Sequence, residues 1–142
     1  MEQTKTRKFL IATHGRLATG IKSSLDIIIG RADNVFLIEA YIDENKSIED
    51  ELEQLMKNIG DDDELIAFTD LLGGSVTNQV LRYTAAKKIH VISGFNLALL
   101  IEILMADTAT PVEEVIDAAI ISAREQLVYV NKLITANAGD ND

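Results

Sequence analysis

Short apolar segments alternate with helical patterns along almost the whole chain. Strand-length apolar runs occupy residues 8–13, 35–41, 64–70 and 88–93. Between and after them, apolar residues recur at helical spacing over residues 17–29, 47–60, 75–86, 96–106 and 111–125. Strands that alternate with helices predict βαβ units. We therefore expect a doubly wound α/β fold with a sheet of four parallel strands and helices on both faces.

One segment near the C-terminus breaks this alternation. Residues 127–134, LVYVNKLI, directly follow a helical pattern yet alternate in the manner of a strand. We expect an extra strand here, either at an edge of the chain's own sheet or given to a neighbouring chain. The sequence predicts a single domain over residues 1–135, with a frayed tail at residues 136–142.

Composition excludes several classes of function. The 142 residues carry 13 basic and 23 acidic side chains, for a net charge of −10. Such a surface repels nucleic acid and anionic membranes. Neither a signal peptide nor an apolar stretch of about 18 residues occurs, so we expect a cytoplasmic protein. With no cysteine and two histidines, the sequence predicts neither a metal site nor a cofactor.

Polar residues follow three of the predicted strands. Thr13-His14-Gly15 comes after the first, residues 69–75 (TDLLGGS) after the third, and residues 93–96 (SGFN) after the fourth. Ligands of open α/β sheets bind outside the carboxyl ends of the strands. These three segments should therefore converge on one site if their strands are neighbours.

The residue types in these segments fit transfer of a phosphoryl group to and from a histidine. His14 needs a partner that fixes one ring nitrogen and leaves the other as a nucleophile, and Asp70 is the candidate. Gly73-Gly74-Ser75 opens a helix, where backbone N–H groups and the hydroxyl favour an anion.

Each of these residues also has a simpler interpretation. His14 alone fits a polar residue at a strand end, Asp70 a turn or helix cap, and Gly73-Gly74-Ser75 a turn with an N-cap.

His90 lies inside a strand and fits a structural role. Asp61-Asp62-Asp63 fits a solvated loop better than a calcium site, because its spacing matches no calcium loop. Neither a phosphate loop nor a dinucleotide-binding motif is present, which argues against direct nucleotide binding.

Three motifs together resemble one known family. A strand ending in Thr13-His14-Gly15 is similar to the start of the IIA domain of the mannose-family sugar phosphotransferase system. Residues 68–80, FTDLLGGSVTNQV, resemble the family's Asp-x-x-Gly-Gly-Ser-x-x-Asn motif, and residues 91–104, VISGFNLALLIEIL, its fourth strand and following helix. The three occur in the family's order and spacing.

The resemblance implies a phosphoryl carrier. His14 would accept a phosphoryl group from phospho-HPr on Nε2 and pass it to a separate IIB protein, for sugar uptake through membrane IIC and IID components. Asp70 would orient the ring, and Ser75 with the backbone of Gly73 and Gly74 would contact the phosphoryl group. Thr13 and Asn78 match family positions with less defined roles. Leu71 and Leu72 would either contact a partner or pack in the core.

The resemblance also implies a homodimer, in which residues 127–134 form an antiparallel edge strand exchanged between subunits.

Two alternatives of function stay open. Phosphotransfer subunits of dihydroxyacetone kinases carry a similar strand-end histidine and glycine motif, and a histidine-phosphorylated regulatory module would use the same residues. The second alternative is a non-catalytic protein that binds a small anion at Gly73-Gly74-Ser75.

Overall fold

The structure is a computed structural model that describes residues 6–84 and 89–140, the last five of these by their backbone alone. The chain divides into two compact units, Met1–Leu97 and Ala98–Asp142. Each unit is described by itself below. Among the described residues, no helix is long and apolar enough to cross a membrane.

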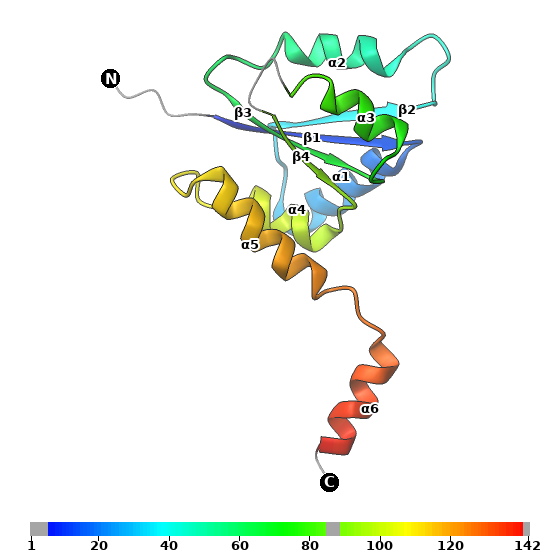
Figure 1. Ribbon diagram of the computed structural model, residues 1–142, viewed down its shortest axis with the longest axis vertical. Helices are drawn as coiled ribbons and strands as arrows, with labels where there is room; N and C mark the ends of the chain where they lie inside the picture. The colour runs from blue at the N-terminus through cyan, green and yellow to red at the C-terminus, as the bar shows by residue number, and fades with distance from the viewer. Residues whose placement is uncertain (1–5, 85–88, 141–142) are drawn as a thin grey trace. The chain divides into compact units, whose positions relative to one another are not determined.

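A parallel sheet forms the centre of the first unit (Figure 1). Its strands are β1 (Arg7–His14), β2 (Val35–Ala40), β3 (Glu64–Thr69) and β4 (Ile89–Ser93). They are ordered β2-β1-β3-β4, and each neighbouring pair is parallel. The predicted sheet of four parallel strands is confirmed. The chain winds from β1 to β2 on one side and returns to place β3 on the other, so β1 is a switch point of the topology.

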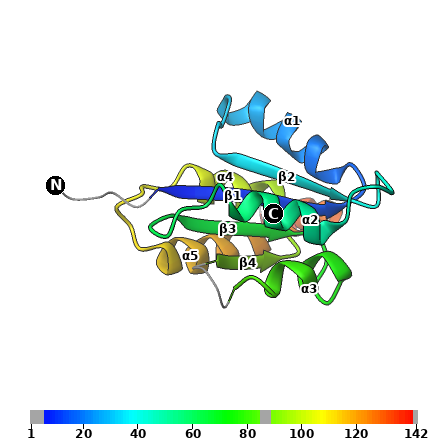
Figure 2. The same cartoon turned by 90° about the horizontal axis from the view of Figure 1, so that it is seen from above.

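Helices cover both faces of this sheet, as predicted. α1 (Leu17–Ile29) lies on one face, and α2 (Ile48–Met56) and α3 (Ser75–Leu81) lie on the other (Figures 1 and 2). Ser47 caps α2, because its hydroxyl accepts a hydrogen bond from the backbone N–H of Asp50 at 3.0 Å. α3 is shorter than the predicted helix over residues 75–86, of which residues 85 and 86 lie outside the described part.

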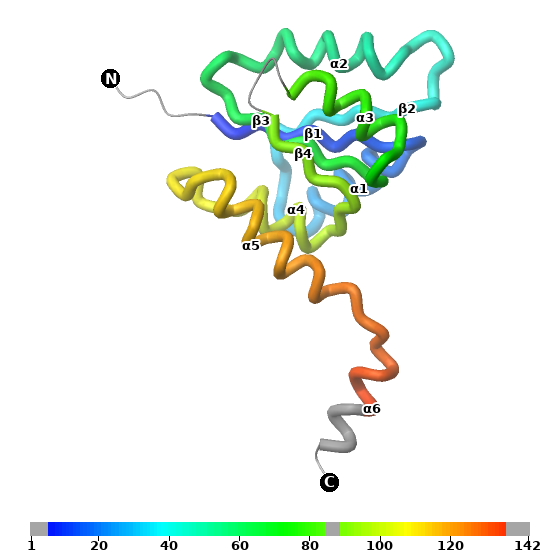
Figure 3. Tube along the Cα trace, viewed as in Figure 1, coloured from blue at the N-terminus to red at the C-terminus, as the bar shows by residue number. Residues whose placement is uncertain are grey.

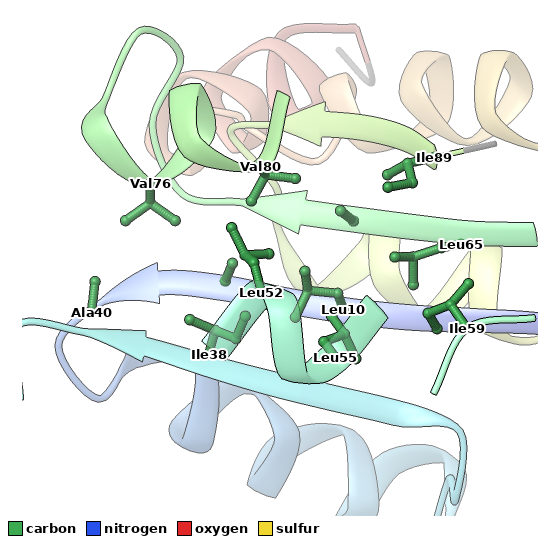
Figure 4. Close-up of a cluster of buried hydrophobic side chains, with 12 residues drawn as sticks. Leu10, Ile38, Ala40, Leu52, Leu55, Ile59, Leu65, Val76, Val80 and Ile89 are labelled. Atoms are coloured by element: carbon green, nitrogen blue, oxygen red, sulfur yellow. The ribbon is translucent and has the colours of Figure 1, made fainter. Parts of the chain in front are cut away.

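A buried apolar cluster joins α2 and α3 to the sheet (Figure 4). Alternate residues of each strand face it, which is the period of two expected of strands. Leu10, Leu52, Leu65, Val76 and Val80 in this cluster are fully buried. Each such side chain contributes roughly 1.5–3 kcal/mol relative to an exposed one. This packing fixes the start of α3 against the carboxyl ends of the strands.

The second unit is helical. α4 (Leu97–Leu104) begins at the last residue of the first unit, and α5 (Val112–Arg124) and α6 (Val130–Asp140) follow. Pro111 is the N-cap of α5, and Glu113 and Glu114 lie in the first turn. Acidic residues there complement the positive end of the helix dipole.

The predicted C-terminal strand at residues 127–134 is wrong for the described chain. Residues 127–129 have no regular structure, and α6 begins at Val130 (Figure 3). A strand needs a neighbour to satisfy its backbone N–H and C=O groups, whereas a helix satisfies them within itself. Val130, Leu133 and Ile134 also fit the spacing of a helix face, which the alternating interpretation overlooked.

Candidate functional site

The carboxyl ends of β1, β2 and β3 meet at one edge of the sheet. Ala12 pairs with Thr69 in register, so His14 and Asp70 follow neighbouring positions although they are 56 residues apart in sequence. His14 itself is opposite Ala40 at the end of β2. The sheet register therefore brings together the two polar segments predicted after the first and third strands, residues 13–15 and 69–75.

One carboxylate oxygen of Asp70 contacts His14 twice. Oδ2 accepts a hydrogen bond from the His14 backbone N–H at 2.8 Å and lies 2.9 Å from ring Nδ1. The Asp70 side chain is 11% exposed and the His14 side chain 38% exposed. The carboxylate is thus enclosed while the imidazole reaches solvent.

The state of the ring follows from these contacts. An ionised carboxylate only accepts hydrogen bonds, so Nδ1 carries the proton that lies between the two groups. In the neutral imidazole, Nε2 then has a free lone pair. Asp70 therefore leaves the outer nitrogen of His14 as a nucleophile.

The pKa of Asp70 is lowered from its ordinary value. Burial acts to raise this pKa, but the hydrogen bonds from the His14 backbone N–H and ring, together with the charge of His14, outweigh burial. The carboxylate is consequently ionised at neutral pH. It is placed to stabilise positive charge on the ring.

The loop after Asp70 is fixed to α3 by a buried threonine. The hydroxyl of Thr77 donates to the carbonyl of Leu71 at 2.6 Å and lies 2.8 Å from the hydroxyl of Thr69. Gly73 adopts φ +76°, a conformation that glycine reaches without strain. Thr77 therefore holds the residues on both sides of Asp70, Thr69 and Leu71. The sequence interpretation overlooked Thr77, whose position on the inward face of α3 was the available signal.

Gly74 lies directly beside the imidazole. A Cβ atom at this position would be 3.5 Å from His14 Cε1 and 3.3 Å from the carbonyl oxygen of Leu71. The N–H of Gly74 donates to that carbonyl at 3.2 Å, so this group stabilises the turn. Gly74 consequently keeps its side of Cε1, the ring carbon bonded to Nε2, free of a side chain. Ser75 follows as the first residue of α3, and its side chain is exposed.

Tyr41 also belongs to this cluster, although the sequence interpretation placed it in a strand. β2 ends at Ala40, and Tyr41 has a φ of 66°. Its ring stacks near that of His14, with centroids 5.6 Å apart and planes inclined by 27°, and its OH lies 2.6 Å from Ser75 Oγ. The signal was available, because Tyr41 follows a strand that ends at the same edge as β1.

Two further predicted residues make different contacts. Thr13 is buried, and its hydroxyl accepts a hydrogen bond from the Ala18 backbone N–H at 3.0 Å. It thereby satisfies one of the free N–H groups in the first turn of α1. Asn78 is exposed on α3, and its backbone N–H donates to the Gly74 carbonyl at 3.0 Å. Within residues 6–84 and 89–140, no three histidine or acidic side chains converge as a metal site would require.

Fold and site together define an α/β protein with a partly exposed histidine–carboxylate pair at the switch point of a parallel sheet. Residues 8–120 match the family model EIIA-man, described as the PTS system fructose IIA component. The chain belongs to this family of sugar phosphotransferase IIA components, of the mannose, fructose and sorbose type.

Solved structures are similar over nearly the whole chain. A candidate phosphoenolpyruvate-dependent sugar phosphotransferase system permease from Klebsiella pneumoniae has 31% identity and a TM-score of 0.88, over 94% of this chain and 98% of that one. The phosphotransferase component EIIA from Streptococcus agalactiae has 31% identity and a TM-score of 0.77, over 89% and 99%.

A curated relative is similar over a shorter stretch. The fructose-specific EIIA component of the phosphotransferase system of Bacillus subtilis is 25% identical over 97 residues. That match spans 67% of this chain and 66% of the relative, slightly less than two thirds of the relative's length.

Proposed function

We propose that this chain is a phosphoryl carrier for sugar uptake, in which His14 accepts a phosphoryl group from phospho-HPr and passes it to a separate IIB protein. The observation that supports this most is the pairing of His14 Nδ1 with Asp70 Oδ2 at 2.9 Å. It leaves Nε2 as the free nitrogen of a side chain that is 38% exposed. Membership of the IIA family supports phospho-HPr as the donor and a IIB protein as the acceptor.

The transfer exchanges one P–N bond for another. The lone pair of His14 Nε2 attacks the phosphorus of the donor's phosphohistidine, the P–N bond to the donor breaks, and its electron pair returns to the donor ring. Positive charge develops on the His14 ring, and the Asp70 carboxylate stabilises it. Transfer to IIB runs the same exchange in reverse. A carrier must therefore bind the phosphoryl group only moderately.

Ser75 and its neighbours complete this proposal. The Ser75 hydroxyl donates to a phosphoryl oxygen, and the glycines at positions 73 and 74 let the group approach. The absence of a side chain at Gly74 supports this role, because a Cβ atom there would contact His14 Cε1, the ring carbon bonded to Nε2, at 3.5 Å.

A phosphorylation assay with a matched control tests the proposal. The protein is mixed with phosphoenolpyruvate, enzyme I and HPr, and its intact mass is measured before and after acid treatment. Wild type and His90→Ala, which lacks the other histidine, should each gain one acid-labile phosphoryl group, and His14→Ala should gain none. Uptake by folded His14→Ala would refute the assignment. Addition of IIB should then discharge the wild-type protein, whereas discharge by a dihydroxyacetone kinase alone would favour that alternative.

A further inference from the structure

Tyr41 combines an unfavourable backbone conformation with an exposed side chain. A φ of 66° is uncommon for any residue other than glycine, asparagine or aspartate, and is an outlier for a bulky one. The Tyr41 side chain is 68% exposed, so burial in a core does not explain the presence of a large aromatic residue here. Backbone strain of this kind concentrates at functional sites.

The contacts of Tyr41 connect the two sides of the site. Its OH lies 2.6 Å from Ser75 Oγ at the start of α3, and its ring stacks near the imidazole of His14 at the end of β1. The backbone also holds Tyr41 beside His14. The preceding residue, Ala40, is the register partner of His14, and its carbonyl accepts a hydrogen bond from the Gly15 N–H at 2.9 Å.

We propose that Tyr41 is a positioning residue, which fixes the Ser75 hydroxyl so that its hydrogen points at a phosphoryl group on His14. This inference rests on the proposed function and adds a residue to it. Either hydroxyl can be the donor while the site is free. Once a phosphoryl anion is attached to Nε2, Ser75 donates to a phosphoryl oxygen, and the Tyr41 OH donates to Ser75 Oγ. Hydrogen bonds in such a chain strengthen one another.

No proton is lost or gained in this arrangement. The P–N bond forms at His14 Nε2 as the donor's P–N bond breaks, and the two hydroxyls change only their orientation. Tyr41 therefore acts on the phosphorylated state through Ser75. Its removal should shorten the lifetime of the phosphohistidine and lower its occupancy at equilibrium with HPr.

A double-mutant cycle tests this role. Wild type, Tyr41→Phe, Ser75→Ala and the double variant are phosphorylated by HPr and, separately, by phosphoramidate, a small donor that needs no protein partner. Loss of the Tyr41 hydroxyl in Tyr41→Phe should speed hydrolysis of the phosphohistidine by about three- to tenfold. The same substitution in Ser75→Ala should have no further effect, because Tyr41 acts through Ser75.

Intrinsic fluorescence gives an independent measurement, because the chain has three tyrosines and no tryptophan. Phosphorylation of wild type should change the tyrosine emission, since the Tyr41 ring stacks near His14. The change should persist in Tyr83→Phe and Tyr129→Phe and disappear in Tyr41→Phe. Thermal melting of each variant checks that the fold is retained.

The outcomes separate this inference from the proposed function. Equal lifetimes in wild type and Tyr41→Phe, or additive effects of Tyr41→Phe and Ser75→Ala, would overturn the role of Tyr41. Slower uptake from HPr with an unchanged lifetime would make Tyr41 a docking contact and also overturn it. If HPr fails to phosphorylate wild type, the proposed function fails, and the lifetimes after phosphoramidate treatment still decide the role of Tyr41.

Discussion

His14 and Asp70 are joined through a single oxygen atom, since Asp70 Oδ2 binds both the backbone N–H and the ring of His14. The imidazole is thereby held relative to its own backbone as well as to the carboxylate. Rotation of the ring would break the contact of Nδ1 with Oδ2, while the hydrogen bond from the backbone N–H remained. The fold therefore sets the orientation of Nε2.

Asp70→Asn should slow phosphoryl transfer more than it alters the fold. A hydrogen bond to a charged group contributes about 1.5–3 kcal/mol, so the rate should fall by roughly ten- to a hundredfold. Single-turnover transfer from phospho-HPr measures this, with Asp61→Asn on an exposed loop as the matched control. Wild-type rates in folded Asp70→Asn would contradict the assigned role.

Asp70 should also make stability depend on pH. Its pKa is lower in the folded state than the ordinary value near 3.9, so the unfolded chain binds the proton more readily as the pH falls. The stabilisation is present above that ordinary value and is lost as the pH falls through the folded pKa. Urea denaturation of wild type and Asp70→Asn between pH 6 and 3 should therefore show a shrinking difference in unfolding free energy. A difference independent of pH would contradict this linkage.

Gly73→Ala and Gly74→Ala should have different effects. Alanine at position 73 meets a φ of +76° and should lose roughly 1–2 kcal/mol of stability. Alanine at position 74 has an ordinary φ of −75°, but its Cβ atom would lie 3.3 Å from the backbone oxygen of Leu71 and would contact His14 Cε1 at 3.5 Å. We expect Gly74→Ala to displace the turn at Leu71 slightly, to melt somewhat below wild type and to transfer slowly, because this turn directly follows Asp70 and lies beside the His14 ring. Melting curves and single-turnover rates check both, and a fast Gly74→Ala would contradict the crowding argument.

Leu72 should contribute to partner docking. Its side chain is 87% exposed in the loop between Asp70 and Gly73, and exposed apolar side chains beside a site favour protein contacts. Leu72→Ser should raise the HPr concentration needed for half-maximal transfer and leave phosphorylation by phosphoramidate unchanged. Ile27→Ser on α1, 83% exposed, is the control and should leave both unchanged. An effect of equal size in the two variants would contradict a docking role.

The strain at Tyr41 should be measurable as stability. Tyr41→Ala and Tyr41→Asn both remove the ring, but asparagine tolerates a positive φ better than alanine. Tyr41→Asn should therefore unfold at a higher urea concentration than Tyr41→Ala, by about 1 kcal/mol. Equal midpoints would mean that the backbone at position 41 relaxes when the ring is removed.

The sequence was sufficient to predict the sheet and the position of His14 near Asp70. Apolar runs located β1 to β4, and the rule for strand ends placed the polar segments at one edge. Tyr41 was missed because an aromatic residue next to an apolar run looks like part of the strand. Its positive φ accompanies contacts with His14 and Ser75, which are distant in sequence and which a local pattern does not encode.

The prediction of a strand at residues 127–134 was wrong for a related reason. Leu127, Tyr129 and Ile134 are all exposed in the described chain, so neither alternation nor helical spacing is enforced by burial. Without a buried face, side-chain periodicity does not choose between strand and helix. The backbone adopts the conformation that satisfies its own hydrogen bonds, which is α6 from Val130 onward.

In the proposed carrier, the pairing of β1 with β3 makes phosphorylation of His14 depend on folding. His14 and Asp70 meet only after a segment of more than fifty residues, containing α1, β2 and α2, has been closed into a loop. A chain in which these strands have not paired has no oriented imidazole, and we expect it to accept phosphoryl groups slowly. The proposed phosphorylation of His14 therefore requires a chain in which β1 and β3 have already paired.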